Sequence, residues 1–206
     1  METSDDKNRQ PVEETCRLFI AVPFPSEIKE QCGQLVSRLQ TAIRFAGAHP
    51  AWVKTQSLHL TLLFLGATNP SRCPEILSLM EKTSKDVKHF NLRLAGVSLF
   101  PNPKNPRVIA LNLFGELLTL QALQNSLHSN FGENGFQFDS RPFRPHVTLA
   151  RLKSMRGLAG VRDVVNSHRD HVVGEVRVTK ITLYRSHLLP DGAEYEVVAE
   201  TPLMAP

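Results

Sequence analysis

Two short segments of this chain share one pattern, and that pattern restricts the fold more than any other feature. His59-Leu60-Thr61-Leu62 and His146-Val147-Thr148-Leu149 both alternate polar and apolar residues. Alternation with period two is typical of a strand with one buried face, so the histidine and threonine of each segment share the opposite face. A predicted helix precedes each segment. We interpret the likeness as a sign of internal duplication, which two equivalent lobes would explain.

The rest of the chain mixes strand and helix patterns without a strict β-α-β order. Apolar periodicity predicts helices at 26–44, 73–87 and 115–130, and strands at 17–22, 58–65, 92–100, 108–113, 146–152, 172–184 and 193–199. Ser26 is a suitable N-cap for the first helix, and Pro190-Asp191-Gly192 marks a hairpin turn. This mixture predicts an α+β fold with largely antiparallel sheets.

Length and composition indicate a globular protein. The chain has 206 residues, of which 41% are hydrophobic, enough for one generous domain or two lobes with a shared core. Residues 1–15 are polar and aperiodic with a net charge of −3, so we predict a disordered tail at 1–15 and a single bilobal domain at 16–206.

Cysteine usage and hydropathy bear on location and cofactors. The three cysteines show no metal-binding spacing, and their odd number argues against a disulfide framework. No apolar run approaches the roughly 18–20 residues of a membrane helix, and the N-terminus does not resemble a secretory signal. We therefore expect a cytoplasmic protein with no metal, no cofactor and no membrane association.

The basic charge is unevenly distributed. Because the tail is acidic, residues 16–206 carry a net charge of +7, and the segment from Ser140 to Arg162 holds six basic residues and no acidic one. Such a run is often only a solvated surface. The functional alternative is a site for an anion or a phosphate group.

If the two His-x-Thr strands met, two imidazoles and two hydroxyls would share one cleft. A pair of histidines can supply one base and one acid near neutral pH. Hydroxyls and a guanidinium can donate hydrogen bonds to phosphate oxygens and stabilise a pentavalent transition state. Opening of a cyclic phosphate and ribonuclease-type transesterification both fit this set of groups. The alternative is that both histidines are structural, partly buried residues.

Five segments, in order, resemble one known family: RLFIAVPFP, SLHLTLLFLG, LAGVSLFPNPKNPRV, RPFRPHVTLAR and ITLYRSHLLPDGAEY. The family is that of the RNA 2′,3′-cyclic phosphodiesterases, also called 2′-5′ RNA ligases or LigT-like proteins, within the two-histidine (2H) phosphoesterase superfamily. The resemblance runs from about residue 17 to 203. It implies a bilobal, pseudo-two-fold α+β fold in which two antiparallel sheets face a central cleft and the helices lie outside.

The resemblance also implies roles for five residues. His146 would be the proton acceptor that activates water, and His59 the proton donor to the departing ribose 3′-oxygen, which leaves a 2′-phosphomonoester. Thr61 and Thr148 would hold phosphate oxygens, and Arg151 would help to bind the phosphate. Arg151 is an odd number of positions from Thr148, so in a regular strand it would face away. It must therefore lie past the strand end or beside a bulge.

The implied partners are RNA ends that carry a 2′,3′-cyclic phosphate, with no obligate protein partner. Arg141 and Arg144 either extend a basic wall toward a further phosphate or are solvated. Three aromatic residues could stack on a base, although core packing is favoured for each: Phe19, Trp52 and Phe143. His168 and His171 have metal-like spacing but fit a surface loop better.

Two other functions remain open. The same site could run in reverse and join a 2′,3′-cyclic end to a 5′-hydroxyl, because both directions share one transition state. The scaffold could also be a non-catalytic RNA- or nucleotide-binding module. A pure binder would not need both the acid and the base.

Overall fold

The computed structural model describes residues 15–43, 50–138, 142–152, 160–190 and 192–205. The predicted tail thus lies almost entirely outside the described residues. The strands are Cys16–Pro23 (β1), Ala51–Trp52 (β2), His59–Thr68 (β3), Phe90–Phe100 (β4), Val108–Gly115 (β5), Val147–Arg151 (β6), Val172–Val178 (β7), Lys180–Leu189 (β8) and Gly192–Pro202 (β9). The helices are Ser26–Ala42 (α1), Cys73–Ser84 (α2), Leu117–Glu133 (α3) and Val161–Ser167 (α4), with short 3-10 turns at Thr55–Ser57 (η1) and Pro70–Arg72 (η2).

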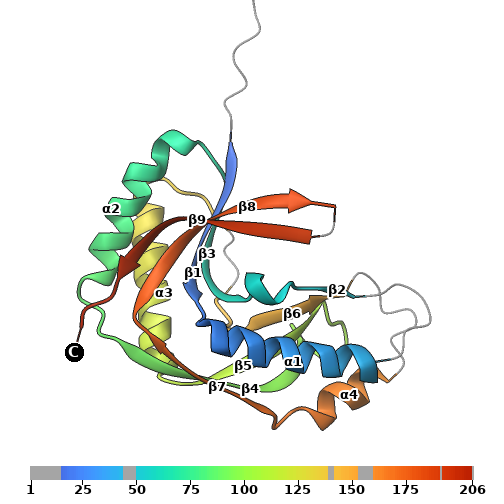
Figure 1. The fold of residues 1–206 in the computed structure, drawn as a ribbon. Helices are drawn as coiled ribbons and strands as arrows, with labels where there is room; N and C mark the ends of the chain where they lie inside the picture. Colours follow the sequence, from blue (N-terminus) through green and yellow to red (C-terminus); the bar gives the residue numbers. More distant parts are fainter. Residues whose placement is uncertain (1–14, 44–49, 139–141, 153–159, 191, 206) are drawn as a thin grey trace, which may run out of the picture.

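The strands form two antiparallel sheets, as the sequence predicts. Sheet A has the order β3-β1-β8-β9, and sheet B has the order β2-β6-β5-β4-β7. Helices α2 and α3 pack together against sheet A, whereas α1 and α4 pack against sheet B (Figure 1). The fold is therefore the expected bilobal α+β arrangement.

The predicted duplication is visible in the order of elements. The run β1-α1-β3-α2 in the first half matches β5-α3-β6-α4 in the second half. In each run, the second strand carries the His-x-Thr motif and pairs with the first strand. The two motifs therefore occupy equivalent places in the two lobes.

Helix α1 shows why these segments fold as they do. Its buried side chains recur every three or four positions, which gives one apolar stripe on an otherwise polar helix, and they are Ile28, Cys32, Leu35, Val36 and Leu39. The predicted cap is wrong: the N-cap is Pro25, and Ser26 is the first helical residue. Proline fixes its own φ near −65°, and the extended Pro25 begins the helix by accepting a hydrogen bond from the Lys29 N–H.

A second correction concerns residues 172–184, which the sequence predicts as one strand. The structure divides them between β7 in sheet B and β8 in sheet A. The nearest buried apolar positions are Val176 and Val178 in β7 and Ile181 and Leu183 in β8, so the alternation shifts by one residue where the chain passes from one sheet to the other at Thr179. Buried side chains from both sheets belong to one hydrophobic cluster. Among the described residues, no helix combines the length and the apolar character needed to cross a lipid bilayer.

Candidate active site

Strands β3 and β6 bring the two motifs together. β3 is an edge strand of sheet A, and β6 is the second strand of sheet B. Although these strands belong to different sheets, they approach each other with Cα atoms within 8 Å. The fold thus places the face that carries His59 and Thr61 close to the strand that carries Thr148.

Each histidine is held by the same backbone hydrogen bond. Nδ1 of His59 lies 2.7 Å from the carbonyl oxygen of Ser57, and Nδ1 of His146 lies 2.9 Å from that of Arg144. A carbonyl oxygen can only accept, so Nδ1–H donates in both cases. In the neutral imidazole, Nε2 then keeps its lone pair. The Thr61 hydroxyl, 3.0 Å away, donates to Nε2 of His59.

Aromatic rings fix the orientation of both imidazoles. Phe100 stacks on His146 with ring centroids 4.2 Å apart and an interplanar angle of 18°. The His59 ring lies 4.8 Å from the ring of Phe19 and meets Tyr195 edge-on at 5.1 Å. These contacts restrict ring rotation and leave each Nε2 as the nitrogen that can exchange a proton.

A bulge in β6 brings Arg151 to the side of the strand that carries Thr148. Thr148 pairs with Ala110 and Arg151 with Val108, so three steps on β6 match two steps on β5. The extra residue is Leu149, and both Leu149 and its neighbour Ala150 are fully buried. Because one inserted residue reverses the alternation, Arg151 shares a face with Thr148. The sequence allowed Arg151 to reach the cleft either past the strand end or beside a bulge, and the structure has the bulge.

The electrostatic environment keeps both histidines neutral at pH 7. Burial lowers the pKa of His59 to about 4, and the positive charges of Lys29 and Arg151 lower it further against the opposing hydrogen bond to Ser57. Burial and the charge of Arg151 also lower the pKa of His146. Arg151 therefore lies near both imidazoles, at the place where an anion would be attracted.

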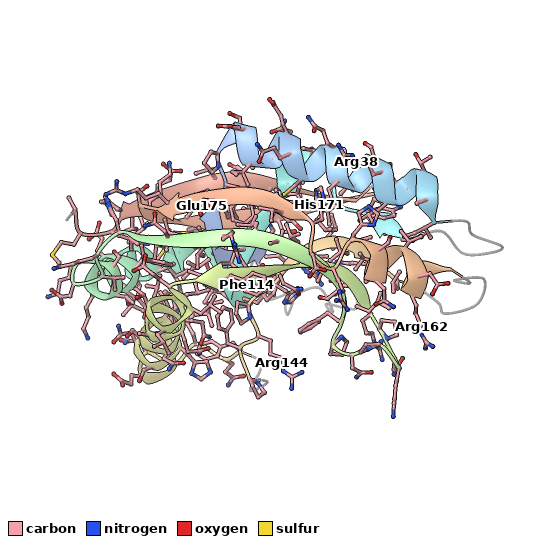
Figure 2. All side chains as sticks on the ribbon, turned by 90° about the horizontal axis from the view of Figure 1, so that it is seen from below. Arg38, Phe114, Arg144, Arg162, His171 and Glu175 are labelled. Carbon is pink, nitrogen blue, oxygen red and sulfur yellow. The ribbon has the colours of Figure 1, made fainter. Side chains whose placement is uncertain are left out.

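Other residues singled out from the sequence have different positions. Phe19 is only 3% exposed, so core packing is correct for it. Trp52 and Phe143 are half-buried and pack against the core. Arg144 is exposed, and Figure 2 shows it well apart from Arg162, while Arg141 lies outside the described residues.

The His168–His171 pair gives no support for a metal site. Their ring centroids are 6.1 Å apart in the segment between α4 and β7. Within the described part of the chain, no three His, Cys, Asp or Glu side chains come close enough together to hold a metal ion. Catalysis without a metal stays a prediction.

Sequence reasoning missed four residues around the histidines: Lys29, Phe100, Tyr184 and Tyr195. Tyr184 and Tyr195 lie within predicted strands, and Tyr184 stacks on Phe19 with centroids 5.2 Å apart. A period-two pattern shows that a side chain leaves one face of a strand, but it does not show which sheet that strand joins. For Lys29 the signal was still weaker, because a charged residue on an amphipathic helix is ordinary.

The sequence profile of the 2′-5′ RNA ligase superfamily matches residues 24–188. The chain belongs to this superfamily. It is 30% identical to the RNA 2′,3′-cyclic phosphodiesterase of Methanothermobacter thermautotrophicus over 179 residues, which cover 87% of this chain and 94% of the relative. It is 33% identical to the RNA 2′,3′-cyclic phosphodiesterase of Thermus thermophilus, over 88% of this chain and 87% of the relative.

Solved structures have the same fold. A crystal structure of a Thermus thermophilus protein superposes with a TM-score of 0.73 at 30% identity, covering 91% of this chain and 97% of that one. E. coli LigT complexed with 3′-AMP superposes with a TM-score of 0.72 at 26% identity, covering 92% of this chain and 99% of LigT. The structural likeness thus extends over nearly the whole length of this chain and of each of the two solved structures.

Proposed function

We propose that this protein hydrolyses 2′,3′-cyclic phosphate ends of RNA to 2′-phosphomonoesters, without a metal. The observation that carries the proposal is the pair of imidazoles, each with Nδ1 bound to a backbone carbonyl and both within reach of the Arg151 charge. The relatives named as RNA 2′,3′-cyclic phosphodiesterases support the choice of substrate.

In this mechanism, Nε2 of His146 accepts a proton from a water molecule as its oxygen attacks phosphorus. The bond between phosphorus and the ribose 3′-oxygen breaks in line with the attack, and Nε2–H of protonated His59 gives its proton to that oxygen. The lowered pKa of His146 suits a base that must be neutral. Thr61, Thr148 and Arg151 donate hydrogen bonds to the non-bridging oxygens, where negative charge accumulates.

The reverse reaction is the second candidate. The superfamily description names a 2′-5′ RNA ligase, and a 5′-hydroxyl could replace water as the attacking group on the same phosphorus atom. Water is in great excess over RNA ends in any dilute solution, so hydrolysis dominates unless a second RNA end is held nearby. Product analysis with paired RNA halves separates the two reactions.

The proposed partner is an RNA end or oligonucleotide that carries a 2′,3′-cyclic phosphate. A cytoplasmic site of action and the absence of an obligate protein partner stay predictions from the sequence. A non-catalytic binding module fits less well, because binding alone does not require two imidazoles in one tautomer.

The test is hydrolysis of an oligonucleotide with a 2′,3′-cyclic phosphate end in the presence of EDTA. We expect His59→Ala and His146→Ala each to lower kcat by about 10²- to 10⁴-fold. His128→Ala is the matched control, because His128 is exposed on α3. Full activity in both active-site variants would refute the proposal, and loss of wild-type activity in EDTA would refute the metal-free mechanism.

A further inference from the structure

The face of sheet B that carries Thr148 extends well beyond the catalytic residues. Thr148 pairs with Ala110 on β5. Side chains alternate along a strand, so Asn112 and Phe114 on β5 point to the same side as Ala110. On β4, Ser98 pairs with Ala110, and Arg93 pairs with Phe114. The cleft face of sheet B, as we call this surface, consists of Thr148, Ser98, Asn112, Arg93 and Phe114.

A polar pair on this face lies beside His146. Val147 pairs with Leu111 on β5, so His146 and Asn112 are the next positions on the two strands. The Ser98 hydroxyl donates a hydrogen bond of 2.6 Å to Oδ1 of Asn112. The Asn112 amide has two N–H donors in addition to this acceptor. Hydrogen-bonding groups are thus available next to the proposed base.

An aromatic ring and a guanidinium lie at the far end of the cleft face. Phe114 is 43% exposed, and the exposed Arg93 has its guanidinium carbon 5.4 Å from the centre of the Phe114 ring. On the neighbouring strand β7, Glu175 and Arg177 point to the same face. Guanidiniums therefore outnumber carboxylates there. Sites for single-stranded nucleic acid combine cations for the backbone with aromatic rings for the bases.

Helix α1 packs on the opposite face of sheet B. A Cβ atom on Gly174 would lie only 2.7 Å from Cδ1 of Ile28 in α1. Gly174 directly precedes Glu175 in β7, so the two residues point to opposite faces. Figure 2 shows Phe114 on the side of the sheet away from α1 and its Arg38. The cleft face is therefore the solvent side of this sheet.

The proposed mechanism assigns the two sides of the phosphorus atom to different lobes. His59 of sheet A gives a proton to the leaving 3′-oxygen, and His146 of the other lobe takes a proton from the attacking group. Because attack and departure are in line, the attacking group arrives from the side of sheet B. Water needs no surface beyond His146. A surface that continues along the sheet suits an attacking group that is itself the end of a strand.

We propose that the cleft face of sheet B binds the RNA strand whose 5′-hydroxyl attacks the cyclic phosphate. This inference rests on the proposed function and makes the same site a ligase when that strand is bound. The 5′-hydroxyl gives its proton to Nε2 of His146 as its oxygen bonds to phosphorus. The bond from phosphorus to the ribose 3′-oxygen breaks, and His59 protonates that oxygen. The product is a 2′-5′ linkage.

The spacing of the residues sets the place of each part of the attacking strand. Asn112 binds the sugar or the phosphate of its first nucleotide. Phe114 is about 14 Å along β5 from Ala110, farther than one nucleotide reaches, so its ring stacks on a base beyond the first. Arg93 binds a backbone phosphate beside that base.

The test measures the ratio of ligated to hydrolysed product in a single reaction. The donor is an oligonucleotide with a 2′,3′-cyclic phosphate and a 5′-phosphate, so it cannot attack itself. The acceptor is either adenosine or the trinucleotide ApApA with a 5′-hydroxyl. For wild type, we expect the ratio to be at least about 5-fold higher with ApApA than with adenosine at equal concentration. Phe114→Ala should lower the ratio with ApApA by about 5- to 150-fold.

Further variants separate stacking from charge. Phe114→Trp keeps a stacking face and should restore the ratio, whereas Phe114→Leu should not. Arg93→Ala should lower the ratio and make it fall less steeply with salt, because one phosphate contact is lost. Leu118→Ala and Arg162→Ala are the matched controls, since both residues are exposed and lie on helices α3 and α4. Circular dichroism of each variant checks that it is folded.

Hydrolysis of the donor in the same tube is the internal reference, so a general loss of folding or of catalysis cancels in the ratio. An unchanged ratio in Phe114→Ala would overturn the inference. Equal ratios with adenosine and ApApA for wild type, or hydrolysis without any ligated product, would overturn it as well. Failure of wild type to hydrolyse the donor would instead refute the proposed function itself.

Discussion

Binding of a phosphate should raise the pKa of His59 enough to protonate it at neutral pH. In the free protein, burial and two neighbouring cations lower this pKa from 6.5 to about 4. A proposed proton donor is then unprotonated in the absence of substrate. The shortfall of about 2.5 pKa units corresponds to about 3.4 kcal/mol, at 1.36 kcal/mol per unit.

A bound phosphate can offset that cost. One negative charge about 4 Å from the imidazole contributes about 4 kcal/mol at an effective dielectric constant of 20, equivalent to about 3 pKa units. We therefore expect the pKa of His59 to rise by about 2–3 units, to the range in which general acid catalysis works at pH 7. On this view, the negative charge of the substrate keeps His59 protonated, and His59 then protonates the leaving oxygen of that substrate.

The measurement is an NMR titration of the imidazole nitrogens between pH 3.5 and 8, with and without saturating adenosine 2′-monophosphate. His59→Gln assigns the resonance. Arg151→Ala should raise the pKa of His59 in the free protein, because the charge of Arg151 lowers it. A free-protein pKa near 6.5, or an unchanged pKa when ligand resonances confirm binding, would refute the reasoning.

Three other predictions follow from the same site. Arg151→Ala should lower kcat/KM by about 10- to 150-fold in a steady-state assay, because a charge-assisted hydrogen bond is lost. Arg151→Lys should keep only part of the wild-type kcat/KM, because Lys lacks the planar fork of the guanidinium. Equal kcat/KM for wild type, Arg151→Ala and Arg151→Lys would contradict this prediction. The folded-state pKa of His59 is depressed, so the contribution of this residue to the free energy of unfolding is present above pH 6.5 and is lost as pH falls toward 4, by up to about 3 kcal/mol. Urea unfolding at pH 7 and pH 4.5 measures this loss. The free energy of unfolding should fall less between the two pH values in His59→Gln than in wild type. Phe19→Ala should lower the free energy of unfolding by about 3–5 kcal/mol, with a shift of the His59 ring resonances, whereas a loss below 1 kcal/mol would show that Phe19 is not a core residue.

The sequence was sufficient for helices α1 to α3, for most of the long strands and for the two motifs, because local periodicity determines them. Alternation predicted β3 and β6, and the apolar stripe predicted α1. The Arg151 parity argument even required an irregularity, and the bulge at Leu149 supplies it.

What could not be predicted depends on pairing between distant strands. Residues 172–184 pass between two sheets with only a one-residue shift in their alternation, and that shift does not by itself show that the strands on its two sides join different sheets. The contacts of Tyr195 with His59, and the place of Phe64 opposite Phe19, arise only once β1 has joined β3 and β8. Register is a property of two strands, and a single strand does not encode it.

The crossing at Thr179 has a consequence for how the molecule comes apart. Among the described residues, sheet A contains the first and the last strands, and the strands of sheet B from β4 to β7 lie between them in sequence. Neither sheet is one continuous piece of chain, because β2 of sheet B precedes β3 of sheet A in sequence, so neither lobe can be excised as a single segment. Hydrogen exchange of β3 and β6 should therefore report one cooperative opening, and the two imidazoles gain or lose their alignment together.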